Sequence, residues 1–451
     1  APRAAVYARI GTCTQEYGTL ASWLVDVLNT LTGNLDRAGG ALFAKSAAFA
    51  SNTAGKPGIG KGVTTGRHRA RVSGAPEVYG ELPITCMAEE IETSGEGQIR
   101  ALFTVATNPV LSSPNGPRLA KALDQLDFMV SMDIYLNETT RHADVILPGV
   151  SPLEDFHYDV AFPRLSWRDH ARYSPPVLPA APGQPEEWQT LLKLAAIAQG
   201  KGVDIDANAL DDAQFAEDAQ RLFGEHAGAV IAATQGLKGP QRTLEVALRS
   251  GPYGDQWGRK PDGLTLAKVQ ASNASGGIDL GELQPRIPEM LRTPSGKVEL
   301  APPSLLQDLQ RAVQDLRGLA PDLVIIGRRD VRTNNSWMHN LPTLARGPFR
   351  CTALVHPQDA QRLGLQDGAL ADIRSASGQV RAQVHVSEEM MPGVVSLPHG
   401  WGHDAPGAQL RVAAERPGAN VNALLDDQRR DPLSGNAVLG GVAITMQAAV
   451  A

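Results

Sequence analysis

The sequence predicts an α/β protein in which open, mostly parallel α/β sheet domains are followed by a small C-terminal β-barrel. The first observation is the alternation of short apolar runs with an amphipathic segment between residues 99 and 132, which is typical of a βαβ unit. The second is a series of short apolar segments separated by Gly and Asp after residue 322, which predicts a barrel of about 130 residues. The third is the length, because 451 residues exceed what one hydrophobic core organises.

The first predicted element is a helix over residues 19–31. Apolar side chains recur at helical spacing from Leu20 to Leu31, and Thr32-Gly33-Asn34 supplies the backbone freedom that ends the helix. Residues 44–80 are rich in Gly, Ser, Ala and basic residues without periodicity, so a long irregular loop is expected there.

The βαβ pattern begins with an apolar run at residues 99–106 and continues with an amphipathic segment at 118–126. Apolar runs at 128–132 and 143–147 follow. Several strands are therefore expected side by side, with their C-terminal ends at one edge of a sheet, where α/β proteins bind ligands.

The middle of the chain is Pro-rich near residue 175 and then helical in pattern around residues 187–199 and 211–223, which predicts a connecting region. Residues 293–300 alternate after a turn and predict a short hairpin strand. Domain boundaries are accordingly expected as 1–175, 176–320 and 321–451.

The last domain is expected to consist mainly of strands. Ser377-Gly378 is a plausible hairpin turn between two of them, and the one predicted helix covers residues 357–363. The predicted strands cover residues 323–327, 370–375, 380–386 and 394–397.

Composition describes an ordinary globular protein. Hydrophobic residues make up 42%, charged residues 20%, and the net charge is −6, which disfavours a nucleic-acid partner. Eighteen consecutive apolar residues and a signal-peptide pattern are both missing, so no membrane span and a cytoplasmic location are expected. Cys13, Cys86 and Cys351 are far apart and form no CxxC pair, so we expect packed thiols and neither a zinc site nor an iron-sulfur cluster.

Three short motifs do not indicate a site. Residues 55–62 almost spell a phosphate-binding loop, but Gly62 replaces the required Ser or Thr and no strand precedes them. His399 and His403 have the spacing of two metal ligands on a helix, but the glycines between them argue against a helix. A Gly-x-Ser-x-Gly nucleophile elbow is also missing.

Polar residues do follow the predicted strands. Thr107 and Asn108 come after one strand, Ser131 and Asp133 come at the end of the next, and Asp144 lies beside the third. Carboxylates accept hydrogen bonds from the N–H groups of guanine, and hydroxyl and amide groups can hold ribose and pyrophosphate, so this set suits a nucleotide. The alternative is that Asn108 and Asp144 only cap turns and helices.

These residues lie in segments that closely resemble the molybdopterin oxidoreductase family, which includes formate dehydrogenases, nitrate reductases and dimethyl sulfoxide reductases. The likeness covers most of the chain and is thin only in the helical middle. The segments upstream of residue 150 are GTCTQEYGT (11–19), LTGNLDRAGG (31–40), VATNP (105–109), SMDIY (131–135) and ETTRHADVILP (138–148). Those downstream are IGR (326–328), NNSWMHN (334–340), HPQD (356–359), LGLQDG (363–368), VNALL (421–425) and DPLSG (431–435).

The resemblance implies a molybdenum or tungsten ion held by two molybdopterin guanine dinucleotides, and a final domain that is a six-stranded double-psi barrel. Gln15 would approach the pterin or the metal. One guanosine diphosphate pocket would be lined by Thr107, Asn108, Ser131, Asp133 and Asp144. The second cofactor would be contacted by Gly327, Arg328, Asn334, Asn335, Ser336, Trp337, His399, Gly400, Trp401 and Asn422. As alternatives, Trp337 and Trp401 could be core aromatics and Asn422 a helix cap.

The sequence departs from the family in one respect. The cysteine cluster for a [4Fe-4S] centre and the residue that ligates the metal are not visible, and Cys13 lies in a different segment from that ligand, so no metal ligand and no catalytic residue are assigned. We therefore expect the C-terminal portion of a catalytic subunit, with the iron-sulfur region in a missing N-terminal part, which the opening Ala1 favours. The alternative is a truncated form that is unable to complete the site.

The expected reaction is a two-electron oxidation or oxygen-atom transfer on a small-molecule substrate, formate dehydrogenase-like or nitrate reductase-like, with an electron-transfer protein or subunit as partner. A rival is a non-catalytic scaffold similar to the large iron-sulfur subunit of respiratory complex I. The retained Arg328, residues 334–337 and Asn422 argue against that rival, because a scaffold has no need of dinucleotide pockets. A nicotinamide-dependent dehydrogenase is disfavoured because no GxGxxG follows a strand.

Overall fold

The computed structural model describes residues 3–49 and 65–450, so the rejected phosphate-loop motif at 55–62 lies outside the described residues. The chain folds into two compact units. Unit 1 consists of Ala1–Val6, Asn29–Gly62 and Gly149–Glu299. Unit 2 consists of Tyr7–Leu28, Val63–Pro148 and Leu300–Ala451.

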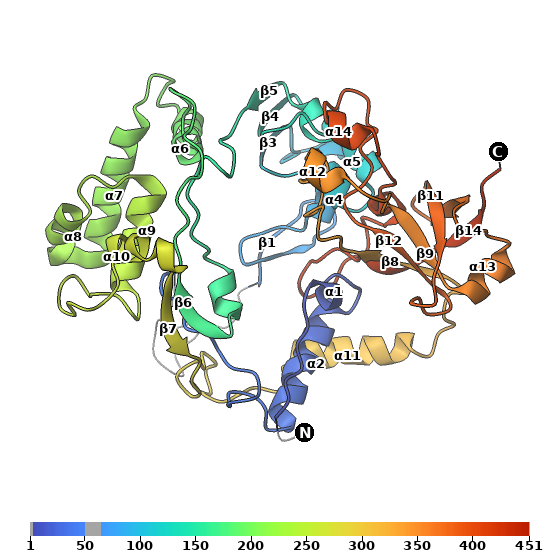
Figure 1. Cartoon of the computed structure of the whole chain (residues 1–451), viewed down its shortest axis with the longest axis horizontal. Coiled ribbons are helices and arrows are strands. Elements are labelled where there is room, and N and C mark those ends of the chain that lie inside the picture. The colour runs from blue at the N-terminus through green and yellow to red at the C-terminus, as the bar shows by residue number, and fades with distance from the viewer. Residues whose placement is uncertain (1–2, 50–64, 451) are drawn as a thin grey trace. The chain divides into compact units, whose positions relative to one another are not determined.

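Unit 2 contains the predicted parallel sheet. Strands β3 (Ala101–Val105), β4 (Phe128–Met132) and β5 (Val145–Leu147) pair in that order, all in parallel (Figure 1). Helix α5 (Gly116–Leu123) connects β3 to β4 and packs its apolar face against α3 (Met87–Glu92). The C-terminal ends of β3 and β4 therefore lie at the same edge of the sheet, and the predicted βαβ unit is confirmed.

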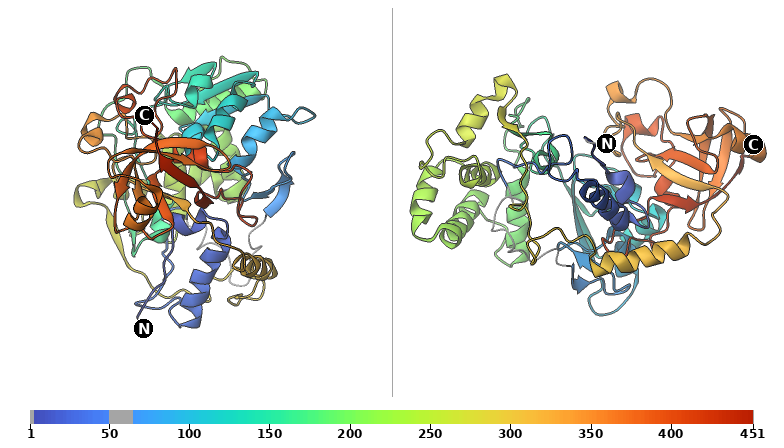
Figure 2. Two further views of the ribbon diagram at one scale, coloured as in Figure 1. Left: turned by 90° about the vertical axis from the view of Figure 1, so that its right-hand side faces the viewer. Right: turned by 90° about the horizontal axis from the view of Figure 1, so that it is seen from below.

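Unit 2 also contains a curled, mixed sheet of seven strands (Figure 2). The strand order is β13-β8-β12-β9-β11-β10-β14, in which β8 runs parallel to β12 and β9 runs parallel to β11. The strands are β8 (Val324–Arg328), β9 (Thr352–Val355), β10 (Leu370–Arg374), β11 (Gln379–Val386), β12 (Val394–Pro398), β13 (Gly440–Ala443) and β14 (Thr445–Ala448). Among the described strands no pairing joins β13 to β14, so a closed six-stranded double-psi barrel is not confirmed and stays a prediction.

The core of this sheet follows the period-two alternation of its strands. Ile325, Ala353, Ile373 and Val395 are fully buried, because alternate side chains of a strand point to one face. Helix α13 (Pro357–Leu363) covers the predicted residues and ends at Gly364 with φ +65°. The predicted hairpin turn is confirmed, since Ser375 N–H donates to the Gly378 carbonyl between β10 and β11.

Other elements differ from the prediction. The hairpin strand predicted at residues 293–300 is wrong: Gly296 N–H closes a turn onto the Thr293 carbonyl, and the chain then continues into helix α11 (Pro303–Asp315). The loop expected at 44–80 contains an antiparallel pair in its described part, β1 (Thr65–Arg69) and β2 (Pro76–Val78). The last domain also has short helices besides α13, namely α12 (Pro342–Ala345) and α14 (Arg411–Ala414).

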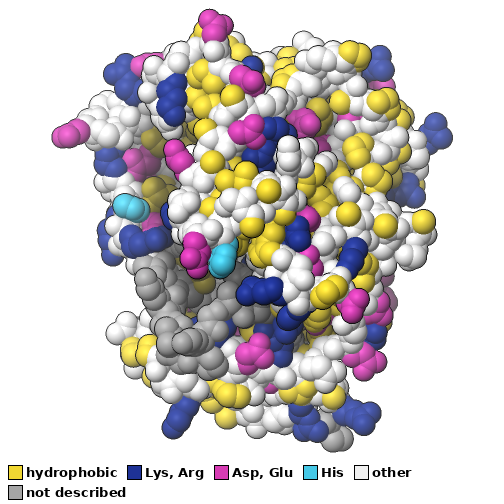
Figure 3. Space-filling model, turned by 90° about the vertical axis from the view of Figure 1, so that its left-hand side faces the viewer, with side chains coloured by type: hydrophobic (Ala, Val, Ile, Leu, Met, Phe, Trp, Pro, Cys, Tyr) yellow, Lys and Arg dark blue, Asp and Glu magenta, His cyan; other side chains and the backbone are white. Residues whose placement is uncertain are grey.

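Unit 1 combines a two-stranded sheet with a group of helices. Strands β6 (Arg168–Ala171) and β7 (Ile278–Glu282) are antiparallel, and their apolar side chains pack with buried residues of the helices, Leu244 and Leu248 among them. Figure 3 shows a face on which basic and acidic side chains are intermixed. The helices are α6 (Glu187–Ala198), α7 (Ala207–Phe223), α8 (Ala227–Ala233), α9 (Gly239–Ser250) and α10 (Leu266–Ala271).

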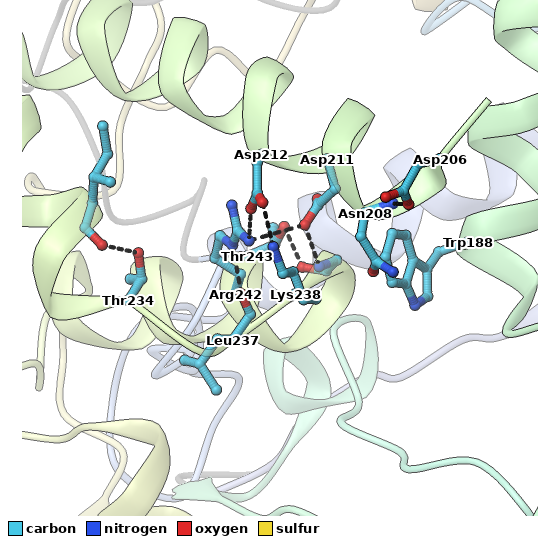
Figure 4. Close-up of polar contacts among 12 residues, drawn as sticks. Trp188, Asp206, Asn208, Asp211, Asp212, Thr234, Leu237, Lys238, Arg242 and Thr243 are labelled. Atoms are coloured by element: carbon cyan, nitrogen blue, oxygen red, sulfur yellow. Dashed lines mark hydrogen bonds and ion pairs between the residues drawn. The ribbon is translucent and has the colours of Figure 1, made fainter.

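A buried arginine ties α9 to α7 in unit 1 (Figure 4). The Arg242 side chain is 7% exposed, donates to the Leu237 carbonyl at 2.8 Å, and forms ion pairs with Asp211 at 3.2 Å and Asp212 at 2.5 Å. Its guanidinium also lies over the Phe215 ring, 4.7 Å from the centroid.

We expect Arg242→Met to lower the free energy of unfolding of unit 1 by about 2 kcal/mol, because it leaves the half-buried Asp211 without its cation. Chemical denaturation followed by circular dichroism measures the change. Arg221→Met removes an exposed pair with Asp218 and is the control, expected to cost less than about 0.5 kcal/mol. Equal losses of unfolding free energy in the two variants would contradict the role of Arg242 in linking α9 to α7.

Within the described residues, no helix has both the length and the apolar content needed to cross a bilayer.

Candidate functional site

The C-terminal edge of the parallel sheet borders a narrow pocket, which we call pocket A. Pocket A brings together predicted site residues from two segments of unit 2 that are far apart in the sequence, because Thr107, Asn108 and Asp133 lie there with Ser336 and Trp337. Its full lining is Thr107, Asn108, Asp133, Tyr135, Asn137, Ser336, Trp337 and Leu410.

Backbone geometry after β3 places Asn108 in this pocket. Ala106 adopts φ +45°, which turns the chain sharply, and Asn108 precedes the short helix α4 (Pro109–Ser112), which begins with a proline. The Asn108 side chain is buried and donates to Glu138 Oε2 at 2.8 Å, while its carbonyl oxygen accepts from Thr139 Oγ1 at 2.7 Å.

Asp133 follows β4 and provides the one carboxylate among the described residues that line pocket A. Its Oδ1 accepts from Tyr135 N–H at 3.0 Å and its Oδ2 accepts from Asn137 Nδ2 at 3.1 Å. Burial raises the pKa of Asp133, and hydrogen bonds from the Tyr135 and Ile134 N–H groups and from Asn137 partly offset that rise. A carboxylate has about four lone-pair sites, so Asp133 can still accept a hydrogen bond from a ligand.

The turn that carries Ser336 and Trp337 depends on two left-handed asparagines. Asn334 has φ +41° and Asn335 has φ +60°, a region that Asn tolerates better than most residues. Gly400 packs against this turn, because a Cβ atom there would lie 2.1 Å from the Asn335 carbonyl oxygen. The Trp337 side chain is 37% exposed at pocket A and offers an aromatic face to a ligand.

A second and larger pocket, of about 450 Å³, lies beside the segment before α2 (Gly18–Leu31) that contains the short helix α1 (Ile10–Cys13); we call it pocket B. It brings together four other predicted residues, Gln15, Gly327, His399 and Asn422. The rest of its lining is Ile10, Gly11, Thr14, Ile326, Arg329, Val421, Leu439, Gly440 and Gly441.

His399 and Asn422 form a polar pair in pocket B. Asn422 Nδ2 lies 3.3 Å from His399 Nδ1 and also donates to the Leu111 carbonyl, while Asn422 Oδ1 is buried and has no partner among the described residues. Burial, together with the charge of Arg329, lowers the pKa of His399 to about 4, so the ring is neutral at pH 7. Glycine-lined walls, an unpaired carbonyl oxygen and an arginine fit a large planar group that hydrogen-bonds along its edge and carries phosphates.

Several predicted residues do not face either pocket with their side chains. The Arg328 guanidinium donates to the Thr352 carbonyl at 2.7 Å, to the Arg350 carbonyl at 3.2 Å and to the Ser396 carbonyl. Its neighbour Arg329 lines pocket B instead, and sequence reasoning missed it although the two arginines are adjacent.

Three more predicted residues lie elsewhere. The Ser131 hydroxyl is fully buried and hydrogen-bonds Thr104 Oγ1 at 2.7 Å. Asp144 lies at the N-terminal end of β5, where it accepts from Met129 N–H at 2.7 Å, at the opposite end of the sheet from pocket A. Trp401 is a core aromatic with edge-to-face contacts to His339 and Phe349.

Metal-ligating residues do not cluster: within residues 3–49 and 65–450, no three His, Cys, Asp or Glu side chains are placed to hold a metal ion. Cys13, Cys86 and Cys351 are free thiols, and burial raises the pKa of Cys351 to about 11. His399 and His403 are in different surroundings, since His403 pairs with Glu138.

Two family models match the chain. The one described as "Molybdopterin oxidoreductase" matches residues 10–162, and the one described as "Molydopterin dinucleotide binding domain" matches residues 323–443. Together they cover more than half of the chain.

Curated relatives are similar over most of this chain. The assimilatory nitrate reductase catalytic subunit of Bacillus subtilis is 26% identical over 79% of this chain and 46% of its own length. The F420-dependent formate dehydrogenase subunit alpha of Methanocaldococcus jannaschii is 25% identical over 69% of this chain and 40% of its own length. The thiosulfate reductase molybdopterin-containing subunit of Salmonella typhimurium is 25% identical over 92% of this chain and 54% of its own length. The chain thus spans about half the length of the curated relatives it matches.

A solved structure shares the fold. Acetylene hydratase from Pelobacter acetylenicus superposes with a TM-score of 0.56 and 20% identity, covering 81% of this chain and 46% of that protein. This likeness supports an α/β fold with a parallel sheet and a curled mixed sheet.

Proposed function

The chain belongs to the molybdopterin oxidoreductase family, and from that premise we propose that it binds a bis-molybdopterin guanine dinucleotide carrying molybdenum or tungsten. The proposed reaction is a two-electron oxidation or an oxygen-atom transfer, formate dehydrogenase-like or nitrate reductase-like. When bound, such a cofactor supplies the metal at which that chemistry takes place. The observation that carries the proposal is that Asp133, Asn108 and Trp337 meet in one pocket.

In pocket A the protein would hold a guanine base. The Asp133 carboxylate can accept from the ring N–H and the exocyclic amino group of guanine together. Adenine has a ring nitrogen without hydrogen at the matching position and would face the carboxylate with one repulsive contact. Stacking on the exposed face of Trp337 would add affinity for any planar base.

In pocket B the protein would hold the pterin part of a cofactor. Asn422 Oδ1 would accept a hydrogen bond, the neutral His399 would orient the ring edge, and Arg329 would neutralise phosphate charge. Gln15 would approach the pterin. Residues 321–451 would act as the dinucleotide-binding domain, with 1–175 as the α/β domain and 176–320 as a connecting region.

Metal and nucleotide analysis of the protein purified from its own organism tests the proposal. Mass spectrometry would measure molybdenum, tungsten and iron, and acid hydrolysis would release GMP. About one molybdenum or tungsten ion and about two GMP per chain are expected for a bis-dinucleotide cofactor. Iron without either metal and without GMP would overturn the proposal and favour an electron-transfer scaffold similar to the large iron-sulfur subunit of respiratory complex I.

A further inference from the structure

The orientation of the Asn108 side-chain amide is determined by two neighbours, Thr139 and Glu138, which do not line pocket A. Thr139 Oγ1 donates its hydrogen to Asn108 Oδ1 and accepts from Val110 N–H at 3.1 Å. A flipped amide would place its NH2 group against this hydroxyl and its carbonyl oxygen against the Glu138 carboxylate. The hydroxyl could still accept from the NH2 group, but the hydrogen bond to Glu138 would be replaced by a repulsive contact between two oxygen atoms.

Glu138 accepts a hydrogen bond from the NH2 group of that amide. Glu138 is itself paired with His403, which is distant in the sequence. Its Oε2 accepts from Asn108 at 2.8 Å and its Oε1 lies 3.0 Å from His403 Nδ1, across 265 residues of sequence. The two side chains of the pair are 1% and 0% exposed. Burial opposes ionisation, but the hydrogen bonds from His403 and Asn108 and the charge of His403 outweigh it and lower the pKa of Glu138.

The surroundings of His403 keep the pair in place. The His339 ring lies 4.6 Å from the His403 ring and 4.3 Å from the Trp401 ring, centroid to centroid. Burial and the charge of His403 lower the pKa of His339 to about 4, so His339 is neutral at pH 7. The Glu138–His403 pair is thus buried, with a neutral ring against His403, and in such surroundings a hydrogen bond to a carboxylate is strong.

We propose that Glu138 and His403 are positioning residues for pocket A, which hold the Asn108 amide so that one N–H and one carbonyl lone pair face the bound nucleotide. The inference rests on the proposed function of pocket A for its ligand, but the orientation of the amide can be measured without any ligand. Neither Glu138 nor His403 contacts the nucleotide in this proposal; both act through Asn108.

Guanosine diphosphate is the probe, and its dissociation constant for the full chain is measured by titration calorimetry. Glu138→Met removes both acceptor oxygens at similar side-chain length and is expected to weaken binding about tenfold, the loss typical of one hydrogen bond to a charged group. Glu138→Gln restores one acceptor and is expected to recover affinity to within about threefold of the wild type.

A matched control comes from the same unit. Asp427 is a buried carboxylate that accepts from Asn115 at 3.0 Å and from Arg118 at 2.6 Å, also across unit 2, and it does not line pocket A. Asp427→Leu is therefore expected to lower the melting temperature but to change the dissociation constant less than twofold.

A double variant tests whether Glu138 acts through Asn108. In an Asn108→Ala background, Glu138→Met should cause no further loss of affinity for guanosine diphosphate, because a residue that acts through Asn108 has nothing left to position.

The side-chain amide of Asn108 gives the ligand-free measurement. In a chain labelled with 15N-asparagine, one Asn108 proton should resonate downfield and resist exchange in the wild type and in Asp427→Leu. Loss of the resonance in Asn108→Ala assigns it, and it should move upfield in Glu138→Met.

A wild-type amide without such a proton overturns the inference, even if Glu138→Met does not fold. It is also overturned by unchanged guanosine diphosphate binding in a folded Glu138→Met variant. Failure of the wild type to bind guanosine diphosphate would count against the proposed function of pocket A, while the amide resonance would still decide the positioning role.

Discussion

Asp133→Asn is expected to weaken binding of guanosine diphosphate by about 100-fold, because two hydrogen bonds to a charged acceptor are affected at once. The asparagine keeps one carbonyl oxygen and replaces the other oxygen by an NH2 group, which would face a guanine donor. Calorimetric titration with guanosine diphosphate and with adenosine diphosphate measures both affinities. The preference for the guanine nucleotide should fall with the affinity, since one carbonyl and one NH2 group complement the edge of adenine.

Asp144→Asn is the matched control for this variant. Sequence reasoning assigned Asp144 to the same nucleotide pocket, but the structure places it at the N-terminal end of β5, bonded to Met129 N–H. We expect its guanosine diphosphate affinity to stay within about twofold of the wild type, as for a residue without ligand contact. Equal losses in the two variants would show that the nucleotide does not bind at the C-terminal edge of the sheet.

The elements that sequence predicted best are those whose burial is dictated by their own residues. Strand β4 and helix α13 match the predicted residues at both ends, because an uninterrupted apolar run and a His-Pro start followed by a glycine stop are local signals. Strands β13 and β14 were missed, since β13 begins with Gly440 and Gly441 and both strands are short and sparsely buried. Their pairing is determined by β8 and β10, which lie far away in the sequence.

The candidate site was predictable in part for the same reason. Thr107, Asn108 and Asp133 follow strand ends, and a parallel sheet brings such residues to one edge without further information. The direction of a side chain at a strand end is not a local property. Arg328, the last residue of β8, turns to the carbonyl groups of neighbouring strands, while Arg329, after the strand has ended, lines pocket B.

The segment beside pocket B is fixed by a buried residue, Asp431, whose role neither the composition nor the periodicity of the sequence indicates. Asp431 is fully buried, and its carboxylate accepts from Thr19 N–H at 2.9 Å and from Thr19 Oγ1 at 2.8 Å, in the first turn of α2. It also accepts from the N–H and the hydroxyl of Ser434. First-turn N–H groups have no partner within their own helix, so Asp431 caps α2 from 412 residues away, directly after the loop that carries Gln15.

Asp431→Ala is therefore expected to lower the free energy of unfolding of unit 2 by about 3 kcal/mol, as for a buried charged acceptor whose donors are left unpaired. Denaturant titration followed by tryptophan fluorescence measures it. Asp404→Ala, at an exposed position, is the control and should cost less than about 0.5 kcal/mol. A similar small cost for Asp431→Ala would contradict its role as an anchor.

The pH dependence of the same contribution follows from the pKa of Asp431. Burial opposes its ionisation, but the N–H groups of Thr19 and Ser434 and their hydroxyls outweigh burial and lower the pKa. A carboxyl whose pKa is lower in the folded than in the unfolded chain adds stability above its unfolded pKa, about 3.9, and loses that stability as pH falls through the folded value. The difference in unfolding free energy between wild type and Asp431→Asn should thus be constant from pH 7 to about pH 5 and shrink below about pH 4. A difference that grew on acidification would mean that the protonated acid, and not the carboxylate, holds Thr19 in place.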